Sequence, residues 1–362
     1  MDKKQLQLTY KELQNTLTAR DFLQNAGLHK KDVLAVMDKG VWLEAMEKLT
    51  TGEVSCRNVL NLCSPAMESF AGSKPKDGWL PALYGHMIRK IYPHRDDIPA
   101  TDQYDKAAAF YLECLRFFLK KEKERLPFSR IRDFDFATEE ELAESPYEEE
   151  YRRFLQCFSD AYLYELMRIG REIMPFDMLA HVAGVHHIAM HIARQLVKTG
   201  IPVDLPLISG AAAAHDIGKY GCRENEVRRI PYLHYYYTDL WCRVHELPNM
   251  GHIAANHSTW DLELENLTVE SLILIYADFR VKNNGYDEKG KEIMGFYSLA
   301  SSFAVILNKL DNVDTAKENR YRHVYSRLED FENYMKALGV NVDLTSCALQ
   351  PIPQRNPALL NI

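Results

Sequence analysis

The segment Ala211-Ala-Ala-Ala-His215-Asp216-Ile-Gly-Lys219 constrains the fold of this chain more than any other. Four alanines in succession let neighbouring helices approach closely, because the distance between packed helices depends on the side chains at the contact. A short side chain such as that of Asp216 can then reach a metal ion shared between helices. Imidazole and carboxylate groups are common ligands of Zn, Mn and Fe. The segment therefore predicts a tightly packed helical core with a metal site at this pair.

Two other segments contain a candidate metal ligand next to a run of apolar residues. His181 begins a helical stripe of apolar residues that faces inward. The stripe consists of Val185, Ile188, Ile192 and Ala193. Asp278 ends the apolar run 271–277, where a buried carboxylate needs a partner such as a metal ion.

The order His…His-Asp…His…Asp resembles that of the HD superfamily of metal-dependent phosphohydrolases. The resemblance covers residues 178–285 and not the first 150 or the last 70 residues. It rests on three segments: His181 followed by Val185, Ala189 and Ala193; residues 211–219; and Ile253–Ser258 followed by Glu270–Asp278. The last segment is similar to the branch that hydrolyses dinucleoside tetraphosphates symmetrically. The resemblance implies an all-α fold, with an HD-domain helical bundle and an additional helical N-terminal region.

The resemblance also implies which residues bind a first metal. The four matching positions are His181, His215, Asp216 and Asp278. Members with two metals use two more histidines, and Asp216 would then bridge the metals. We expect a divalent transition metal, and two such ions in the full site, drawn from Fe, Mn, Zn, Co or Ni, with Mg as a further option.

The second metal has one clear ligand, and His234 is the residue that we assign as the other. His257 lies in its own motif, and His234 precedes it by 23 residues, a spacing similar to that of the family. His245 and His252 compete with His234, because tyrosines follow His234 where the family often has small residues. Taken singly, a histidine on an apolar helix face is usually an ordinary core or surface residue.

Two lysines are predicted to contact the substrate. Lys219 follows His215 by four residues and Asp216 by three, so on a helix it shares their face. Lys282 follows Asp278 by four residues and would face the site, whereas Arg280 would point away. We assign Asp216 and Lys219 a catalytic role, and Lys219 and Lys282 a substrate-binding role.

These residues predict a phosphohydrolase that uses metal-activated hydroxide. Two metals about 3.5–4 Å apart polarise a phosphoryl group and lower the pKa of a bridging water. The resemblance favours a phosphoester or phosphoanhydride of a nucleotide-type substrate. Two alternatives remain open: a nucleotide-sensing module with little turnover, and a di-iron oxygenase with the same ligand set. Lys219 and Lys282 favour a phosphorylated substrate over an uncharged one.

Composition limits the partners of the chain. Its 362 residues are 46% hydrophobic and 26% charged, with a net charge of −7. This charge argues against broad nucleic-acid binding, which needs a basic face. The seven cysteines form no CxxC pair, so we expect them to be reduced thiols. The N-terminus does not resemble a signal peptide. No apolar run reaches the ~20 residues that are needed to span a membrane. We therefore expect a cytoplasmic protein that does not enter the membrane.

The pattern along the chain is helical throughout. Residues 1–145 are predicted to be a helical region of unknown role, with a long helix over 104–124. Residues 146–340 are predicted to be the HD-type domain, ending in a helix over 318–338. The acidic segment 134–150 is expected to be mobile apart from a helix start at Thr138, and 341–362 is expected to be an extended tail or a linker to a partner. The oligomeric state stays open.

Overall fold

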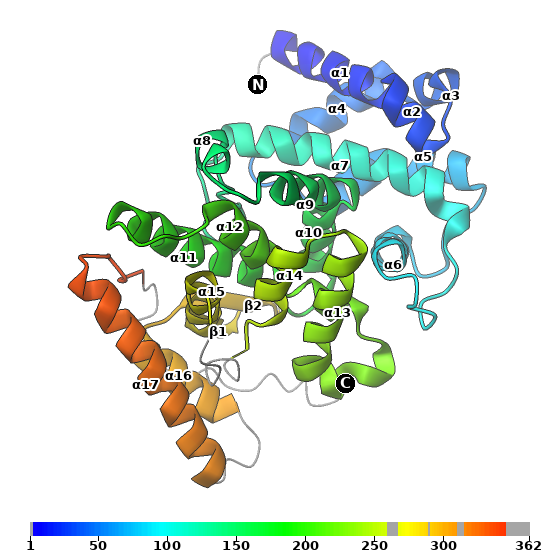
Figure 1. Cartoon of the computed structure of the whole chain (residues 1–362). Coiled ribbons are helices and arrows are strands. Elements are labelled where there is room, and N and C mark those ends of the chain that lie inside the picture. Colours follow the sequence, from blue (N-terminus) through cyan, green and yellow to red (C-terminus); the bar gives the residue numbers. More distant parts are fainter. Residues whose placement is uncertain (1–2, 259–266, 289, 310–314, 345–362) are drawn as a thin grey trace. The chain divides into compact units, whose positions relative to one another are not determined.

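A computed structural model describes residues 3–258, 267–288, 290–309 and 315–344. The chain is mostly helical, as predicted, and the described residues add a single two-stranded sheet (Figure 1). It divides into two compact units: one comprises Met1–Phe128 and Ala161–Ile173, the other Ser129–Asp160 and Met174–Ile362. The predicted boundary at residue 145 lies inside the second unit, and the segment 161–173 belongs to the first.

The first unit contains nine helices among its described residues. They are α1 (Lys3–Leu17), α2 (Arg20–Ala26), α3 (Lys30–Val36), α4 (Lys39–Leu49), α5 (Cys56–Ala71), α6 (Trp79–Ile91), the short 3₁₀ helix η1 (Asp102–Tyr104), α7 (Asp105–Arg125) and α10 (Leu163–Ile173). The long helix predicted over 104–124 is confirmed as α7. It packs against α5, and aromatic residues such as Phe110 and Phe118 bury its inner face.

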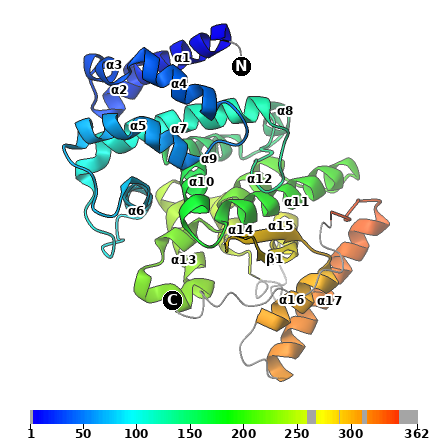
Figure 2. The same ribbon diagram turned by 180° about the vertical axis from the view of Figure 1, so that it is seen from behind.

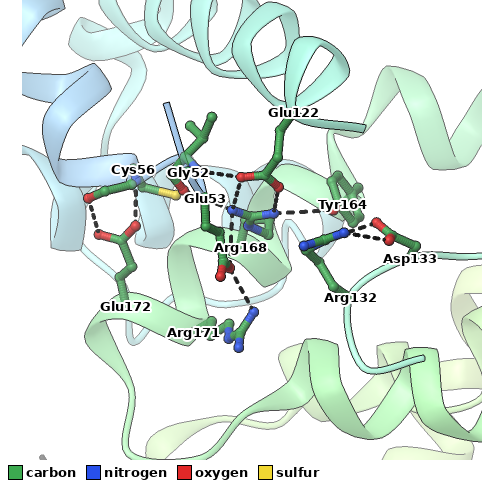
Figure 3. Close-up of polar contacts among 12 residues, drawn as sticks. Gly52, Glu53, Cys56, Glu122, Arg132, Asp133, Tyr164, Arg168, Arg171 and Glu172 are labelled. Atoms are coloured by element: carbon green, nitrogen blue, oxygen red, sulfur yellow. Dashed lines mark hydrogen bonds and ion pairs between the residues drawn. The ribbon is translucent and has the colours of Figure 1, made fainter. Parts of the chain in front are cut away.

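A buried ion pair lies inside the first unit. The Glu122 carboxylate of α7 accepts hydrogen bonds from the Arg168 guanidinium of α10, at 2.6 Å for the closer pair of atoms (Figure 3). Arg168 also donates to the Val54 carbonyl oxygen at 2.8 Å, and the Val54 N–H donates to Glu122. Both charged side chains are almost fully buried. The pair therefore ties α7 and α10 to the segment that precedes α5.

The second unit contains all the predicted metal ligands and a β-hairpin. Its elements are α8 (Glu139–Ala143), α9 (Glu148–Asp160), α11 (Met178–Lys198), α12 (Leu205–Ala214), η2 (Ile217–Gly221), η3 (Glu224–Arg229), α13 (Ile230–Val244), α14 (Pro248–Ala255), α15 (Val269–Arg280), β1 (Val281–Tyr286), β2 (Glu292–Phe296), α16 (Leu299–Lys309) and α17 (Thr315–Ala337). The helices α16 and α17 lie side by side (Figures 1 and 2). The final helix predicted over 318–338 is confirmed as α17.

The alanine-rich helix α12 forms the centre of the second unit. Every residue from Pro206 to Ala214 is buried, and α12 packs against α11, α14 and α15. A Cβ atom at Gly210 would lie 2.2 Å from the terminal carbon of Met250 on α14, so the Met250 side chain packs directly onto the backbone of α12 at this glycine. The small residues thus produce the close helix packing that the sequence predicts.

The acidic segment 134–150 is not the mobile stretch that we expected. Phe134 and Phe136 stack on each other, and both rings contact the buried His186 edge-on. The predicted helix start is confirmed, because Thr138 caps α8 in a capping box with Glu141. The ring contacts of two half-buried phenylalanines and a capped helix start outweigh the acidic composition that suggested mobility.

The hairpin β1–β2 was not predicted. Its strands are antiparallel, with Val281 paired to Phe296, and the register is irregular between Asn283 and Tyr286. It follows α15 directly, so it starts three residues after the predicted ligand Asp278. Among the described residues, no helix combines the length and apolar character needed to cross a membrane. The six described cysteines are free thiols. The tail from residue 345 onward lies outside the described residues.

Candidate metal centre

His215 and Asp216 lie at a break between two helices, not inside one helix as predicted. The helix α12 ends at Ala214, and the 3₁₀ helix η2 begins at Ile217. The Thr238 hydroxyl of α13 occupies the break: it donates to the His215 carbonyl oxygen at 3.0 Å and accepts from the Gly218 N–H at 3.1 Å. These backbone groups are thereby satisfied without a further helical turn.

Gly218 lets η2 pack against α13. A Cβ atom at this position would lie 1.9 Å from the His234 carbonyl oxygen and 2.5 Å from the Thr238 backbone nitrogen. No side chain fits there without moving one of the two backbones. The glycine in the segment 211–219 therefore brings His234 close to Asp216, which is a role that the sequence analysis did not identify.

Asp216 is the centre around which the other predicted ligands gather. Its Oδ2 lies 3.2 Å from His181 Nε2 and 3.5 Å from His215 Nε2. Its Oδ1 lies 3.6 Å from His234 Nε2 and 3.9 Å from His257 Nε2. One carboxylate oxygen thus faces each pair of imidazoles, and Asp216 itself is 2% exposed.

Asp278 completes the half of the site that faces Oδ2. It lies in the last turn of α15, and its Oδ1 is 3.2 Å from His181 Nε2. The ligand atoms of His181, His215 and Asp278 lie within 4.8 Å of one another, and so do those of His215, Asp216 and His257. All six residues predicted as ligands therefore meet in one cluster.

The histidines present the nitrogen that a metal requires. Three of them use Nδ1 to bond a backbone carbonyl oxygen one turn earlier. These bonds join His215 to Ala212 at 2.8 Å, His234 to Ile230 at 2.6 Å and His257 to Ala254 at 2.6 Å. A neutral ring whose Nδ1–H donates leaves the Nε2 lone pair facing inward, which is the arrangement typical of metal-bound histidine.

The close approach of these nitrogens fits a cation between them. His181 Nε2 lies 3.4 Å from His215 Nε2, and His234 Nε2 lies 3.4 Å from His257 Nε2. In His234 and His257 both lone pairs point into the same space, so they repel unless a proton or a metal lies between them. The donor set of imidazole nitrogen and carboxylate oxygen suits a divalent transition metal.

The protonation states suit metal binding as well. Burial lowers the pKa of His234 to about 4, and burial together with the neighbouring His215 lowers the pKa of His257 to about 4. Burial alone would raise the pKa of Asp216, but the Lys219 ammonium and the surrounding imidazoles hold it well below its usual range. At neutral pH these imidazoles are neutral and this carboxylate is ionised, as metal ligands must be.

Both predicted lysines contact the cluster. Lys219 Nζ lies 2.5 Å from Asp216 Oδ2, and a third of the side chain is exposed. Lys282 lies on β1 and not on a helix, because α15 ends at Arg280. Its Nζ nevertheless donates to the Asp278 carbonyl oxygen at 2.6 Å and lies 3.8 Å from Asp278 Oδ1. The ammonium groups of Lys219 and Lys282 therefore lie beside the half of the site that contains Asp278.

The other histidines have different surroundings. His245 packs on the Trp241 ring at 4.7 Å, and His252 is exposed and hydrogen-bonds Asn256. His186 is buried on another face of α11, where its Nε2 lies 3.1 Å from the Ser209 hydroxyl. Of the three candidates for the open second-metal position, only His234 lies in the cluster.

We predict that His234→Ala removes one metal ion and that His245→Ala removes none. The His234 imidazole faces Asp216 Oδ1, whereas the His245 ring lies on Trp241. Metal analysis of each purified variant after loading with Mn²⁺ would measure the ratio of metal to protein. The prediction is contradicted if His245→Ala loses metal while His234→Ala retains the wild-type ratio.

Comparison of the chain with protein-family models, with curated proteins and with solved structures gave no match. What this chain does must therefore be inferred from its own residues and their geometry.

Proposed function

We propose that the chain is a metal-dependent phosphohydrolase of the HD type, with two divalent metals and a nucleotide-type substrate. One observation carries the proposal: the two oxygens of a single buried carboxylate, Asp216, face two separate pairs of imidazole nitrogens. His181, His215 and Asp278 would hold one metal, and His234 and His257 the other, with Asp216 shared. When bound, such metals polarise a phosphoryl oxygen and lower the pKa of a bound water.

The residues of the chain have separate tasks in this proposal. Backbone carbonyl groups orient three imidazoles, so the ligands are held before a metal or substrate arrives. Lys219 and Lys282 offer ammonium groups beside the carboxylates, where they would attract and orient a phosphate oxygen. Burial lowers the pKa of Lys219, but the charge of Asp216 outweighs this effect and raises it, so Lys219 is a cation at neutral pH.

The two lysines support phosphate chemistry over the oxygenase alternative. An uncharged substrate would not use two ammonium groups at the edge of the site, whereas a phosphorylated substrate would. The sensing alternative has the same ligands and differs only in turnover. Metal binding by itself therefore does not separate a hydrolase from a sensor, and the test needs a measured reaction.

The deciding experiment is a screen of phosphorylated substrates with defined metals. The purified chain would be freed of metal and then supplied with Mn²⁺, Co²⁺, Ni²⁺ or Fe²⁺. Release of phosphate or nucleotide would be measured from dinucleoside polyphosphates, mononucleotides, cyclic dinucleotides and simple phosphoesters. Turnover that requires metal supports the hydrolase. Binding of a nucleotide without turnover indicates the sensor, and the absence of bound metal under all four conditions would reject the proposal.

A further inference from the structure

Three successive tyrosines follow His234, and each has a different environment. Tyr236 is 60% exposed, whereas Tyr237 is buried and its hydroxyl donates to Glu226 on η3. Tyr235 is half-buried, and its ring lies against two histidines of the cluster. The same residue type therefore occurs on the surface, in the core and beside the candidate metal centre. Only the last position lies next to proposed ligands.

The Tyr235 ring spans the pair of histidines that faces Asp216 Oδ1. Its centroid lies 3.9 Å from that of the His234 ring and 4.8 Å from that of the His257 ring. Each imidazole is also held at Nδ1 by a backbone carbonyl oxygen. A hydrogen bond at one ring nitrogen still leaves the ring free to tilt about that bond. Contact with a third ring restricts the tilt of both imidazoles.

We propose that Tyr235 is a positioning residue for the second metal, because its ring holds the imidazoles of His234 and His257 in the orientation that one divalent ion requires. This inference rests on the proposed two-metal function. The aromatic face has a second effect. An imidazole bound to a divalent ion becomes electron-poor, and the negative face of a tyrosine ring attracts such a group. Tyr235 therefore favours the metal-bound form of the pair over the free form.

The chain supplies matched variants for a test of this inference. Tyr235→Ala removes the ring, Tyr235→Leu keeps most of the packing volume without an aromatic face, and Tyr235→Phe keeps the ring without the hydroxyl. Tyr236→Ala makes the same change one residue later, at an exposed position. Metal-free protein would be titrated with Mn²⁺ by calorimetry, and circular dichroism would check that each variant is folded.

We expect Tyr235→Ala and Tyr235→Leu to weaken one of the two Mn²⁺ sites by about 10–100-fold, the range typical of residues that orient metal ligands. The other site should keep its affinity. Tyr235→Phe and Tyr236→Ala should bind both ions as the wild type does. The weakened site should be the one that His234→Ala abolishes.

Three results would overturn the inference. Wild-type affinity of both sites in Tyr235→Ala would show that the ring does not orient the ligands. Equal weakening in Tyr235→Phe would assign the effect to the hydroxyl. A raised KM with unchanged Mn²⁺ affinity would make Tyr235 a substrate contact. A wild-type chain that binds fewer than two ions would instead reject the two-metal function itself, and the wild-type titration alone would reveal it.

Discussion

Replacing Asp216 by alanine is expected to abolish both metal binding and turnover while leaving the helical fold in place. Both Asp216 oxygens face imidazole nitrogens, so the substitution removes the one group that the two halves of the site share. Metal catalysis contributes several kcal/mol of transition-state stabilisation, and each 1.4 kcal/mol is about tenfold in rate. We therefore expect kcat to fall by at least about 10³-fold, measured with the substrate that the screen identifies.

A matched substitution separates metal loss from general damage. Asp239→Ala makes the same change on α13, where Asp239 pairs with the exposed Arg243 at 2.8 Å, and it should keep both activity and metal. Asp216→Asn keeps the shape of the side chain and removes its charge, so it should lose metal as Asp216→Ala does. Far-ultraviolet circular dichroism should be unchanged in all three. Turnover near the wild-type level in Asp216→Ala would show that the site is wrongly assigned.

The candidate ligands could be predicted from sequence because their order resembles that of a metal-binding superfamily. His181, His215, Asp216 and Asp278 stand in motifs of small and apolar residues, and the structure brings their ligand atoms together. The spacing from His257 favoured His234, but the choice among His234, His245 and His252 could not be completed in this way. It depends on the close approach of η2 to α13 at Gly218, which is a contact between segments distant in sequence.

The ends of the helices around the site also could not be predicted from the sequence. The segment 211–219 has helical spacing, yet α12 ends at Ala214 because the Thr238 hydroxyl bonds the backbone on both sides of the break. The run after Asp278 likewise continues the helical pattern as far as Lys282, but a strand begins at Val281 and pairs with Phe296. In both places a tertiary contact overrides local periodicity.

In the first unit, the burial of a charged residue could not be predicted from the sequence either. The stretch around Glu122 is rich in lysine and glutamate, and such a run is most simply a solvated helix face. Glu122 is instead fully buried, because Arg168 from a segment 46 residues further along the chain reaches it. Nothing near Glu122 in the sequence indicates this partner, so this buried ion pair could be recognised only in the structure.

Breaking this buried pair is expected to cause the largest loss of stability in the first unit. Arg168→Met leaves the Glu122 carboxylate buried without its guanidinium, and Glu122→Leu leaves the Arg168 cation with the half-exposed Glu53 carboxylate, 3.6 Å away, in place of the buried one (Figure 3). Removing one partner of a buried ion pair typically costs about 3–5 kcal/mol, because the remaining buried charge loses its closest opposite charge. Chemical denaturation of the full chain would measure the change in the free energy of unfolding.

The double variant Glu122→Leu with Arg168→Met distinguishes the effect of losing the ion pair from the effect of changing side-chain packing at these two positions. If the loss in each single variant comes from an unpaired charge, removing both charges should destabilise the unit far less than the sum of the single losses. An exposed pair in the same unit is the control: Lys90 lies 3.2 Å from Asp105, and Lys90→Met should cost less than about 1 kcal/mol. Additive losses in the double variant would instead mean that Glu122 and Arg168 stabilise the unit through separate contacts, with the Val54 backbone as the main partner of each.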